Sequence, residues 1–163
     1  MEVEKLMIQS ALSNWNLTIN RLNKFFGALS TEDFYEPIAP SKNRIIYVLG
    51  HLAAVHDRTQ EILGLTARQH PELEKPFITN PDRAVEPIPE GKELLALWNE
   101  INTHLYNGML TFAPIHWIGR HQAVSEDDFR KDPSRSCLSV LLNRTNHAGY
   151  HLGQLMLSGK LKS

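Results

Sequence analysis

Hydrophobic residues recur near the start of the chain at alternating steps of four and three positions. The series runs through Ile8, Leu12, Trp15, Ile19, Leu22, Phe26 and Leu29. This heptad-like spacing is typical of a helix that packs nearly parallel to its neighbours. No proline interrupts the pattern before Pro37. The pattern therefore predicts one long helix over residues 2–29.

Three further segments show the amphipathic periodicity of helices, at residues 44–64, 89–110 and 137–158. Gly64 and Gly159 stand at two of the predicted ends, where glycine often terminates a helix. Leucines spread around much of the circumference of the last segment, which predicts that this helix is central. No segment of useful length alternates as a β-strand does. Four long amphipathic helices indicate an all-α fold, a four-helix bundle.

The segments between these helices differ in length and composition. Residues 65–89 contain five prolines and little periodicity, and they are longer than an ordinary loop between antiparallel helices. Such a connection, between the second and third helices, can carry the chain from one end of a bundle to the other. Residues 30–43 predict a short helical turn broken by prolines, and residues 111–135 read as irregular. A length of 163 residues predicts one domain, over residues 1–163.

Composition and charge narrow the classes of partner. The formal net charge is -1 with 17 basic and 18 acidic residues and no basic block, which argues against nucleic-acid binding. The N-terminus lacks the pattern of a signal peptide, and no apolar run approaches the ~20 residues of a membrane span. Cys137 is the only cysteine, so no intrachain disulfide is possible. These features predict a cytoplasmic protein without a membrane partner.

Two histidines in the last predicted helix are the strongest chemical signal. His147 and His151 are four positions apart, so their side chains project from one side of a helix. Imidazoles at this spacing can bind one metal ion, and a third histidine would complete a site with open positions, as in catalytic zinc centres. The alternative is that each ring makes an ordinary hydrogen bond. The residue after His147 is Ala148, so the pair lacks the glutamate base of zinc proteases.

A third ligand should come from a neighbouring helix, and two histidines of the second helix are candidates. On a helical wheel His56 falls near the middle of the apolar arc, and His51 falls towards its edge. Five positions apart, the two rings point in different directions, and periodicity slightly favours His56 as the more buried. His104 and His70 are expected to be exposed. His116 and His121 lie in irregular sequence, at a pocket mouth or on the surface.

Other polar residues are candidates for lesser roles. Gln154, Asn143 and Tyr47 are spaced to lie near the candidate histidines, although packing or solvent exposure is the commoner role for such residues. Arg120 and Arg144 can hold a substrate carboxylate or can be surface arginines. Cys137 is interpreted as a core or helix-start residue and not as a nucleophile. The three tryptophans are interpreted as core or interface aromatics, namely Trp15, Trp98 and Trp117.

The chain resembles the DinB/YfiT-like superfamily of metalloenzymes. The resemblance rests on His51-Leu52-Ala53 and on His147-x-x-x-His151-x-Gly153-Gln154-Leu155, supported by the length, the four helices and the long connection. It implies a bundle of up-down-down-up topology, and a divalent metal ion, zinc or nickel, bound by His51, His147 and His151. The resemblance thus implies His51 as the third ligand in place of His56, which the helical wheel favoured. His56 then becomes a core histidine or one that contacts the ligands from behind. The resemblance also implies a homodimer.

Members of the family with assigned chemistry include thiol-dependent S-transferases and an isomerase. The resemblance therefore implies a metal-dependent enzyme of the thiol S-transferase or hydrolase type, with a small-molecule substrate and a low-molecular-weight thiol as co-substrate. A metal ion bound by three neutral imidazoles lowers the pKa of a bound water to ~7 or holds a thiol as thiolate. Two alternatives remain open: a non-catalytic bundle stapled by a metal ion, and a plain helical dimerisation module.

Overall fold

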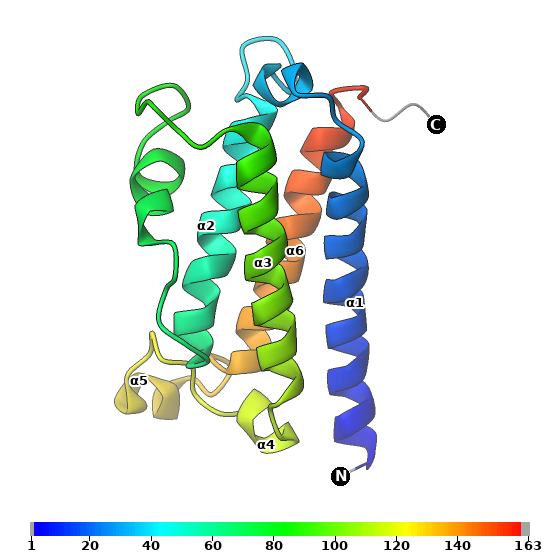
Figure 1. Cartoon of the computed structure of the whole chain (residues 1–163). Coiled ribbons are helices and arrows are strands. Elements are labelled where there is room, and N and C mark those ends of the chain that lie inside the picture. Colours follow the sequence, from blue (N-terminus) through cyan, green and yellow to red (C-terminus); the bar gives the residue numbers. More distant parts are fainter. Residues whose placement is uncertain (1, 161–163) are drawn as a thin grey trace.

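The computed structural model of the chain describes residues 2–160, and four long helices stand side by side in it (Figure 1). They are α1 (Glu2–Gly27), α2 (Ile45–Leu63), α3 (Gly91–Leu110) and α6 (Cys137–Met156). In Figure 1, α1 and α6 run upward while α2 and α3 run downward. The part of the chain that is described contains no β-strand, only two isolated bridges. The all-α prediction is confirmed, and the predicted bounds of the long helices agree to within two residues.

The hydrophobic seam of α1 forms one wall of the core. Trp15, Leu22 and Phe26 are almost completely buried, as the four-and-three spacing predicts. The helix packs mainly against α6 and touches α3 only sparsely. Contact between the rings of Phe26 and Trp98 joins α1 to α3, with the ring centroids 6.3 Å apart. Burial of this seam is what fixes α1 against the rest of the molecule.

The most deeply embedded helix is α2, not α6 as the leucine distribution predicted. It packs against α3, α6 and the connection that follows it, and 13 of its residues are buried. On α6, by contrast, Leu142 and Tyr150 are exposed, and Leu157 just after the helix is exposed as well. The prediction failed because no helix among residues 2–160 covers the leucines on the outer face of α6. One face of α6 therefore remains open to solvent.

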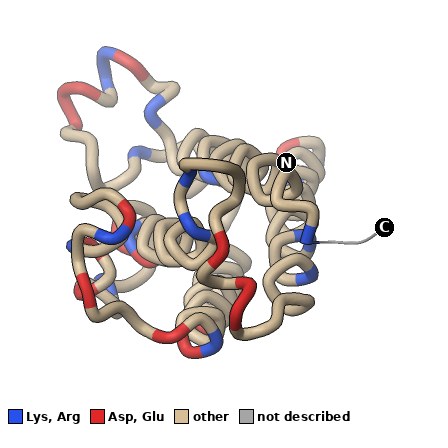
Figure 2. The backbone as a smooth tube through the Cα atoms, turned by 90° about the horizontal axis from the view of Figure 1, so that it is seen from above, with Lys and Arg blue, Asp and Glu red and all other residues tan. Residues whose placement is uncertain are grey.

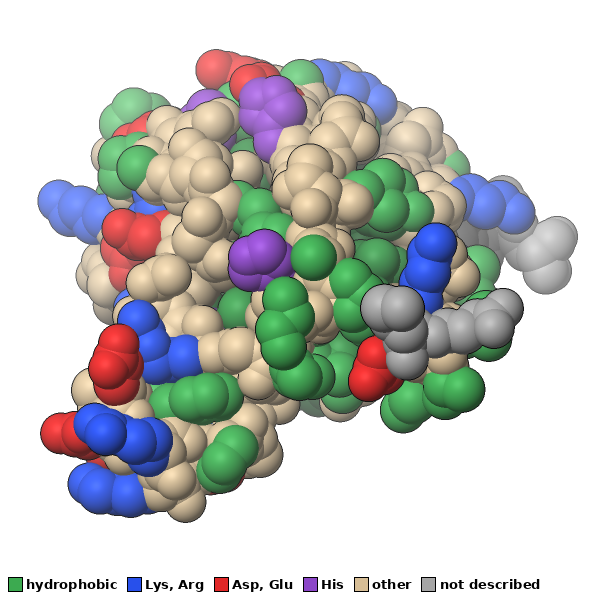
Figure 3. Space-filling view, turned by 90° about the horizontal axis from the view of Figure 1, so that it is seen from below, with side chains coloured by type: hydrophobic (Ala, Val, Ile, Leu, Met, Phe, Trp, Pro, Cys, Tyr) green, Lys and Arg blue, Asp and Glu red, His purple; other side chains and the backbone are tan. Residues whose placement is uncertain are grey.

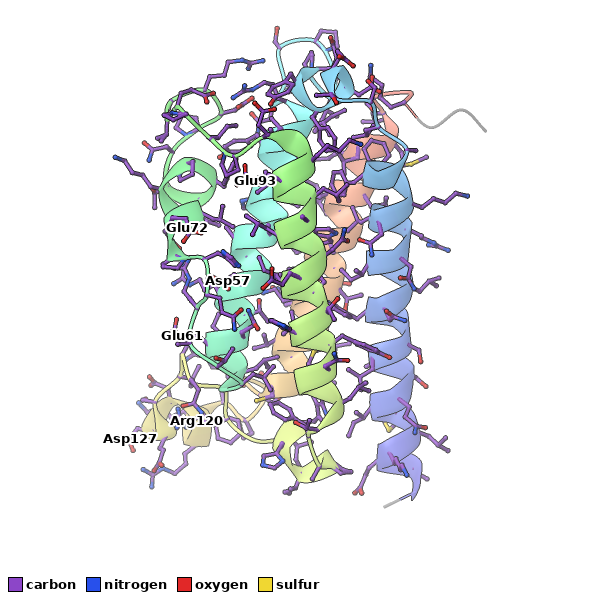
Figure 4. All side chains as sticks on the ribbon, in the orientation of Figure 1. Asp57, Glu61, Glu72, Glu93, Arg120 and Asp127 are labelled. Atoms are coloured by element: carbon purple, nitrogen blue, oxygen red, sulfur yellow. The ribbon has the colours of Figure 1, made fainter. Side chains whose placement is uncertain are left out.

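The long connection between α2 and α3 is fixed to the side of α2. It begins at Gly64, whose positive φ of 74° ends the helix, and contains a short 3-10 helix, η2 (Pro71–Leu73), and a π-helical turn, η3 (Lys75–Thr79). The fully buried carboxylate of Asp57 accepts hydrogen bonds from the backbone amides of Gln69 and His70, both at 3.0 Å. Figure 4 shows Asp57 midway along α2, on the side of this connection. The prediction that His70 is solvent-exposed is wrong, because its side chain is only 18% exposed.

The segment predicted to be irregular, residues 111–135, contains two short helices, α4 (Pro114–Trp117) and α5 (Glu126–Lys131). Trp117 of α4 is fully buried and anchors the segment to the core. The Ser125 hydroxyl caps α5 by accepting from the Asp128 amide. Cys137 is buried at the start of α6, as its interpretation as a core or helix-start residue predicted. The turn predicted after Ser30 is also present, as the short 3-10 helix η1 (Glu32–Tyr35).

Charged residues of both signs lie scattered around the periphery of the molecule, and the described residues form no region of a single sign (Figure 2). No helix within residues 2–160 combines the length and the apolarity that crossing a lipid bilayer requires.

Candidate metal centre

Three histidines meet where α2 packs against α6. The Nε2 atom of His147 lies 3.1 Å from the Nε2 of His51 and 3.1 Å from the Nε2 of His151. One nitrogen from each ring lies within 4.8 Å of the other two, so the group is able to hold a metal ion. His147 and His151 face the same way because they are one helical turn apart on α6. The structure thus brings together the three histidines that the family resemblance implies.

The second nitrogens of two of these rings are held by acceptors. The Nδ1–H of His51 donates to the backbone carbonyl of Phe77 at 2.9 Å, and the Nδ1–H of His151 donates to Oε1 of Gln154 at 2.8 Å. A carbonyl oxygen only accepts, so each Nδ1 carries the proton and each Nε2 presents a lone pair. The Gln154 amide is itself fixed, because its Nε2 donates to the Tyr150 hydroxyl at 2.9 Å. Such partners set the tautomer that a metal ligand needs.

The second nitrogen of His147 differs from those of the other two rings. Its Nδ1 is buried and has no hydrogen-bond partner in the described part of the chain. Burial lowers the pKa of His147 to about 3, and the neighbouring His151 and His51 add to the effect. Burial, followed by the charge of His51, also lowers the pKa of His151. Both rings are therefore neutral at pH 7, which is the form that binds a metal.

His56, the ligand that periodicity slightly favoured, lies elsewhere. The ring is fully buried between Trp15 and Trp98, and its Nδ1 lies 2.7 Å from the side-chain oxygen of Asn102 on α3. Burial lowers its pKa to about 4. The wheel correctly predicted that His56 is the more buried of the pair. Burial did not make it a ligand, because its ring points towards α3 and not along the interface with α6.

The cluster meets the requirements of a divalent ion. Two nitrogens bound 2.0–2.1 Å from one ion at a tetrahedral angle lie roughly 3.3 Å apart, close to the 3.1 Å observed. All three donors are imidazoles, which suit zinc, nickel and copper better than magnesium or calcium. No carboxylate belongs to the cluster within residues 2–160. An ion held there would keep its full charge and have coordination positions open.

A cavity of about 430 Å³ adjoins the cluster at the upper end of the molecule in Figure 1. His51 and His151 line it, together with Tyr150 and the loop over residues 38–43. Among the described residues that line this cavity, Lys42 alone is charged. The loop is held by a backbone bridge between Pro37 and Arg44. The two histidines therefore face a space that a small molecule can enter.

The remaining candidates divide into those near the site and those away from it. Tyr47 lines the cavity while its hydroxyl donates to the Asn80 carbonyl at 2.7 Å. Arg120 does not face the cavity, since its guanidinium donates to the backbone carbonyls of His121 and Val124. The other candidates line a different cavity or lie on the surface, namely Asn143, Arg144, His121, His104 and His116.

Sequence reasoning missed two features of the site. The Phe77 carbonyl that orients His51 is a backbone group, and no residue type in the sequence marks it. The Tyr150 hydroxyl that holds Gln154 follows from an i, i+4 spacing on α6 and was detectable in principle.

Comparison with known proteins adds no assignment. The sequence matches no protein-family model and no curated protein.

Proposed function

We propose that this protein is a metal-dependent enzyme of the DinB/YfiT-like kind, a thiol S-transferase or a hydrolase acting on a small molecule. The observation that carries the proposal is the convergence of one ring nitrogen each from His51, His147 and His151 within 4.8 Å. The directions of α1, α2, α3 and α6 in Figure 1 support the family's up-down-down-up bundle as part of the proposal. The donor set supports zinc or nickel as the ion.

The chemistry follows from the charge of the site. A divalent ion supplies Lewis acidity, which lowers the pKa of a water or a thiol that it binds. The protein contributes orientation: Phe77 and Gln154 fix the His51 and His151 rings so that their lone pairs face one point. Thiolate is the nucleophilic form of a thiol, so a low-molecular-weight thiol fits as co-substrate. The adjoining cavity provides room for the electrophile beside it.

A catalytic role is favoured over a structural staple by the position of the cavity. A structural ion is usually enclosed by four protein ligands. Here three histidines form the cluster, and two of them, His51 and His151, face a space of about 430 Å³. A staple between α2 and α6 would not need that space. A plain helical dimerisation module would not need two rings held in the ligand tautomer.

A homodimer is the second part of the proposal. An apolar groove lies at the lower end of the molecule, between the start of α1 and α4, and Met7, Ile115 and Ile118 line it. Ile115 and Ile118 are 68% and 61% exposed. Figure 3, viewed from below, shows hydrophobic side chains at the surface of this end. Contiguous exposed apolar surface marks an interaction site, and a second copy of the chain would cover it. A cytoplasmic location, which the sequence predicts, is also part of the proposal.

The test is an activity screen on metal-loaded protein. Zinc- and nickel-loaded wild type is assayed for conjugation of glutathione, bacillithiol or mycothiol to chlorodinitrobenzene, and for hydrolysis of nitrophenyl acetate. We expect acceleration of one reaction class, and its loss in His151→Ala. The control His104→Ala alters an exposed histidine and should keep the activity.

A cobalt-loaded sample separates the enzyme from a staple. Addition of azide or a thiol should change the visible spectrum, because an open coordination position admits the added ligand. An unchanged spectrum, together with no activity in either assay, would favour the non-catalytic staple.

A further inference from the structure

A second cavity, separate from the histidine cluster, lies between the lower ends of α2 and α6 and the segment before α6. Its volume is about 530 Å³. The polar residues that line it are Arg135, Arg144, His121, Asn143, Ser134 and Ser139. None of the described residues in this lining carries a carboxylate. The nearby acidic residues Glu61 and Asp132 lie outside the lining, and Figure 4 shows Glu61 on the lower part of α2. Asp132 accepts hydrogen bonds from Ser134 at the edge of the cavity, and its carboxylate interacts with the charge of Arg135. The two arginines of the lining outweigh this one carboxylate, which leaves a net positive charge.

Arg144 lines this cavity and forms no ion pair with any of the described residues. Its Nε–H is buried and has no hydrogen-bond acceptor anywhere in residues 2–160. Burial lowers the pKa of Arg144, and the positive charge of Arg58 adds to the effect. Leaving a buried charged donor without an acceptor costs free energy, and the charge of an anion beside the guanidinium would offset part of that cost. This unsatisfied guanidinium is the observation that points to a ligand.

The other two basic groups are arranged as further donors. Arg135 is exposed at the rim, and its charge contributes, after burial, to the lowered pKa of His121. The Nδ1 of His121 accepts a hydrogen bond from the Ala123 amide at 3.2 Å. The proton of the neutral ring is therefore on Nε2, which is left as a donor. Two arginines and one histidine with a donor nitrogen thus line the same cavity.

The segment that carries His121 is held in place, so this donor does not depend on a ligand for its position. The guanidinium of Arg120 donates to the carbonyls of His121 and Val124, and the Gln122 amide donates to the Ile62 carbonyl of α2 at 2.8 Å. Figure 4 shows Arg120 beside α5 at this end of the molecule. The His121 side of the cavity is therefore fixed by contacts within the protein.

We propose that this cavity binds a phosphate-type oxyanion, the phosphate group of a small molecule or free phosphate. Guanidiniums bind phosphate through paired hydrogen bonds to two oxygens, and a doubly charged anion suits two arginines better than a carboxylate does. The site needs no metal ion, although Arg144 lies on α6 one turn before His147. It is thus a binding function beyond the proposed metal-dependent activity.

Proton–nitrogen NMR of the arginine Nε–H groups tests the proposal on metal-free wild type. The Arg144 signal is identified by its absence from Arg144→Gln. We expect inorganic phosphate to shift this signal saturably at physiological ionic strength, and methyl phosphate to do the same. Acetate should shift it much less. An Arg144 signal that phosphate leaves unmoved would overturn the proposal, and equal shifts with acetate would contradict its assignment to phosphate.

Calorimetry with inorganic phosphate gives an independent measure. Arg144→Gln and Arg135→Gln should each weaken binding roughly tenfold or more, as for loss of a charge-assisted hydrogen bond. The control Arg21→Gln removes the same charge from the exposed face of α1 and should bind as wild type does. Equal weakening in all three variants would indicate attraction by overall charge alone and would overturn the site.

Discussion

The Nε2 atoms of His51 and His147 lie 3.1 Å apart across the interface of α2 and α6, although 96 positions separate the residues in the chain. Only the folded bundle brings these atoms together, so the unfolded chain has no equivalent site. An ion that binds the native state alone stabilises it by about 2.7 kcal/mol at a free concentration one hundred times the Kd. Metal binding and folding stability are therefore linked in this protein.

Gln154 is expected to tune the affinity of the centre through His151. Replacing Gln154 with alanine removes the acceptor that holds the Nδ1–H of His151 at 2.8 Å. Zinc affinity should fall by about 10–100-fold, the usual cost of losing such a partner. Competition with a chromophoric chelator measures the change. Gln154→Glu keeps an acceptor and should retain tight binding, and Gln9→Ala on the exposed face of α1 is the control. Unchanged zinc affinity in Gln154→Ala would show that the His151 ring needs no hydrogen-bond acceptor to bind zinc.

Gly50→Ala should damage both stability and the metal centre. A Cβ at Gly50 would stand 2.4 Å from two ring carbons of Phe77, so the π-helical turn has to move. The cost should be about 1–3 kcal/mol of unfolding free energy in urea titrations. Zinc affinity should fall too, because the Phe77 carbonyl orients His51.

Gly149→Ala is the matched control for that variant. A Cβ at Gly149 meets no atom of the described residues within 4 Å, and the residue lies on α6 between the two histidines. Alanine in a helix interior should stabilise by about 0.5–1 kcal/mol and leave zinc binding unchanged. Equal stabilities for the two alanine variants would contradict the close packing of Phe77 on α2.

The metal-free protein should lose stability as the pH falls from about 6.5 to 4. Burial lowers the pKa of His56 from 6.5 to about 4, so between these values the unfolded state binds the proton more tightly. The stabilisation is complete above pH 6.5 and is lost as the pH falls towards 4. The loss from His56 is on the order of 3 kcal/mol.

Urea titrations at several pH values compare wild type with His56→Gln, whose amide can still reach Asn102. The variant should show a shallower loss, with the remainder due to His147 and His151, whose pKa values are also lowered. Identical pH profiles for the two proteins would mean that His56 is not held neutral by burial.

The proposed dimer predicts a change of mass on mutation of the apolar groove. Wild type should sediment at twice the 18.6 kDa of the chain. The double variant Met7→Lys, Ile115→Lys should be a monomer, because two unpaired charges cannot be buried in the dimer interface. Leu17→Lys, an equally drastic change at an exposed position on the same helix, should remain dimeric. A monomeric wild type, or a dimer that tolerates both lysines, would contradict the assignment.

The long helices could be predicted from the sequence because each buries one continuous stripe. Trp15 and Phe26 of α1 show this directly, since both fall on the predicted seam and both are buried. The short helices α4 and α5 escaped prediction because four and six residues are too few to show a period. The exposure of Leu142 could not be predicted for another reason. Hydrophobicity does not reveal which face of α6 lacks a neighbouring helix in the described structure.

For the site, the spacing of His147 and His151 was enough to predict a shared direction, and the partner on α2 was not determined by periodicity. A wheel ranks His56 and His51 by burial, and the structure agrees with that ranking. A ligand has to face a particular neighbouring helix, and that depends on how α2 and α6 are packed. The Phe77 carbonyl lies further outside the reach of sequence, because every residue has one.

The most direct test of the account is calorimetric titration of chelator-treated protein with zinc. Wild type should bind one ion per chain, and His51→Ala, His147→Ala and His151→Ala should each lose that binding. His56→Gln should still bind zinc, because its ring faces Asn102 and not the cluster. His104→Ala should bind as wild type does. A wild type without zinc or nickel affinity, or a His51→Ala variant that binds as tightly as wild type, would contradict the three-histidine metal centre.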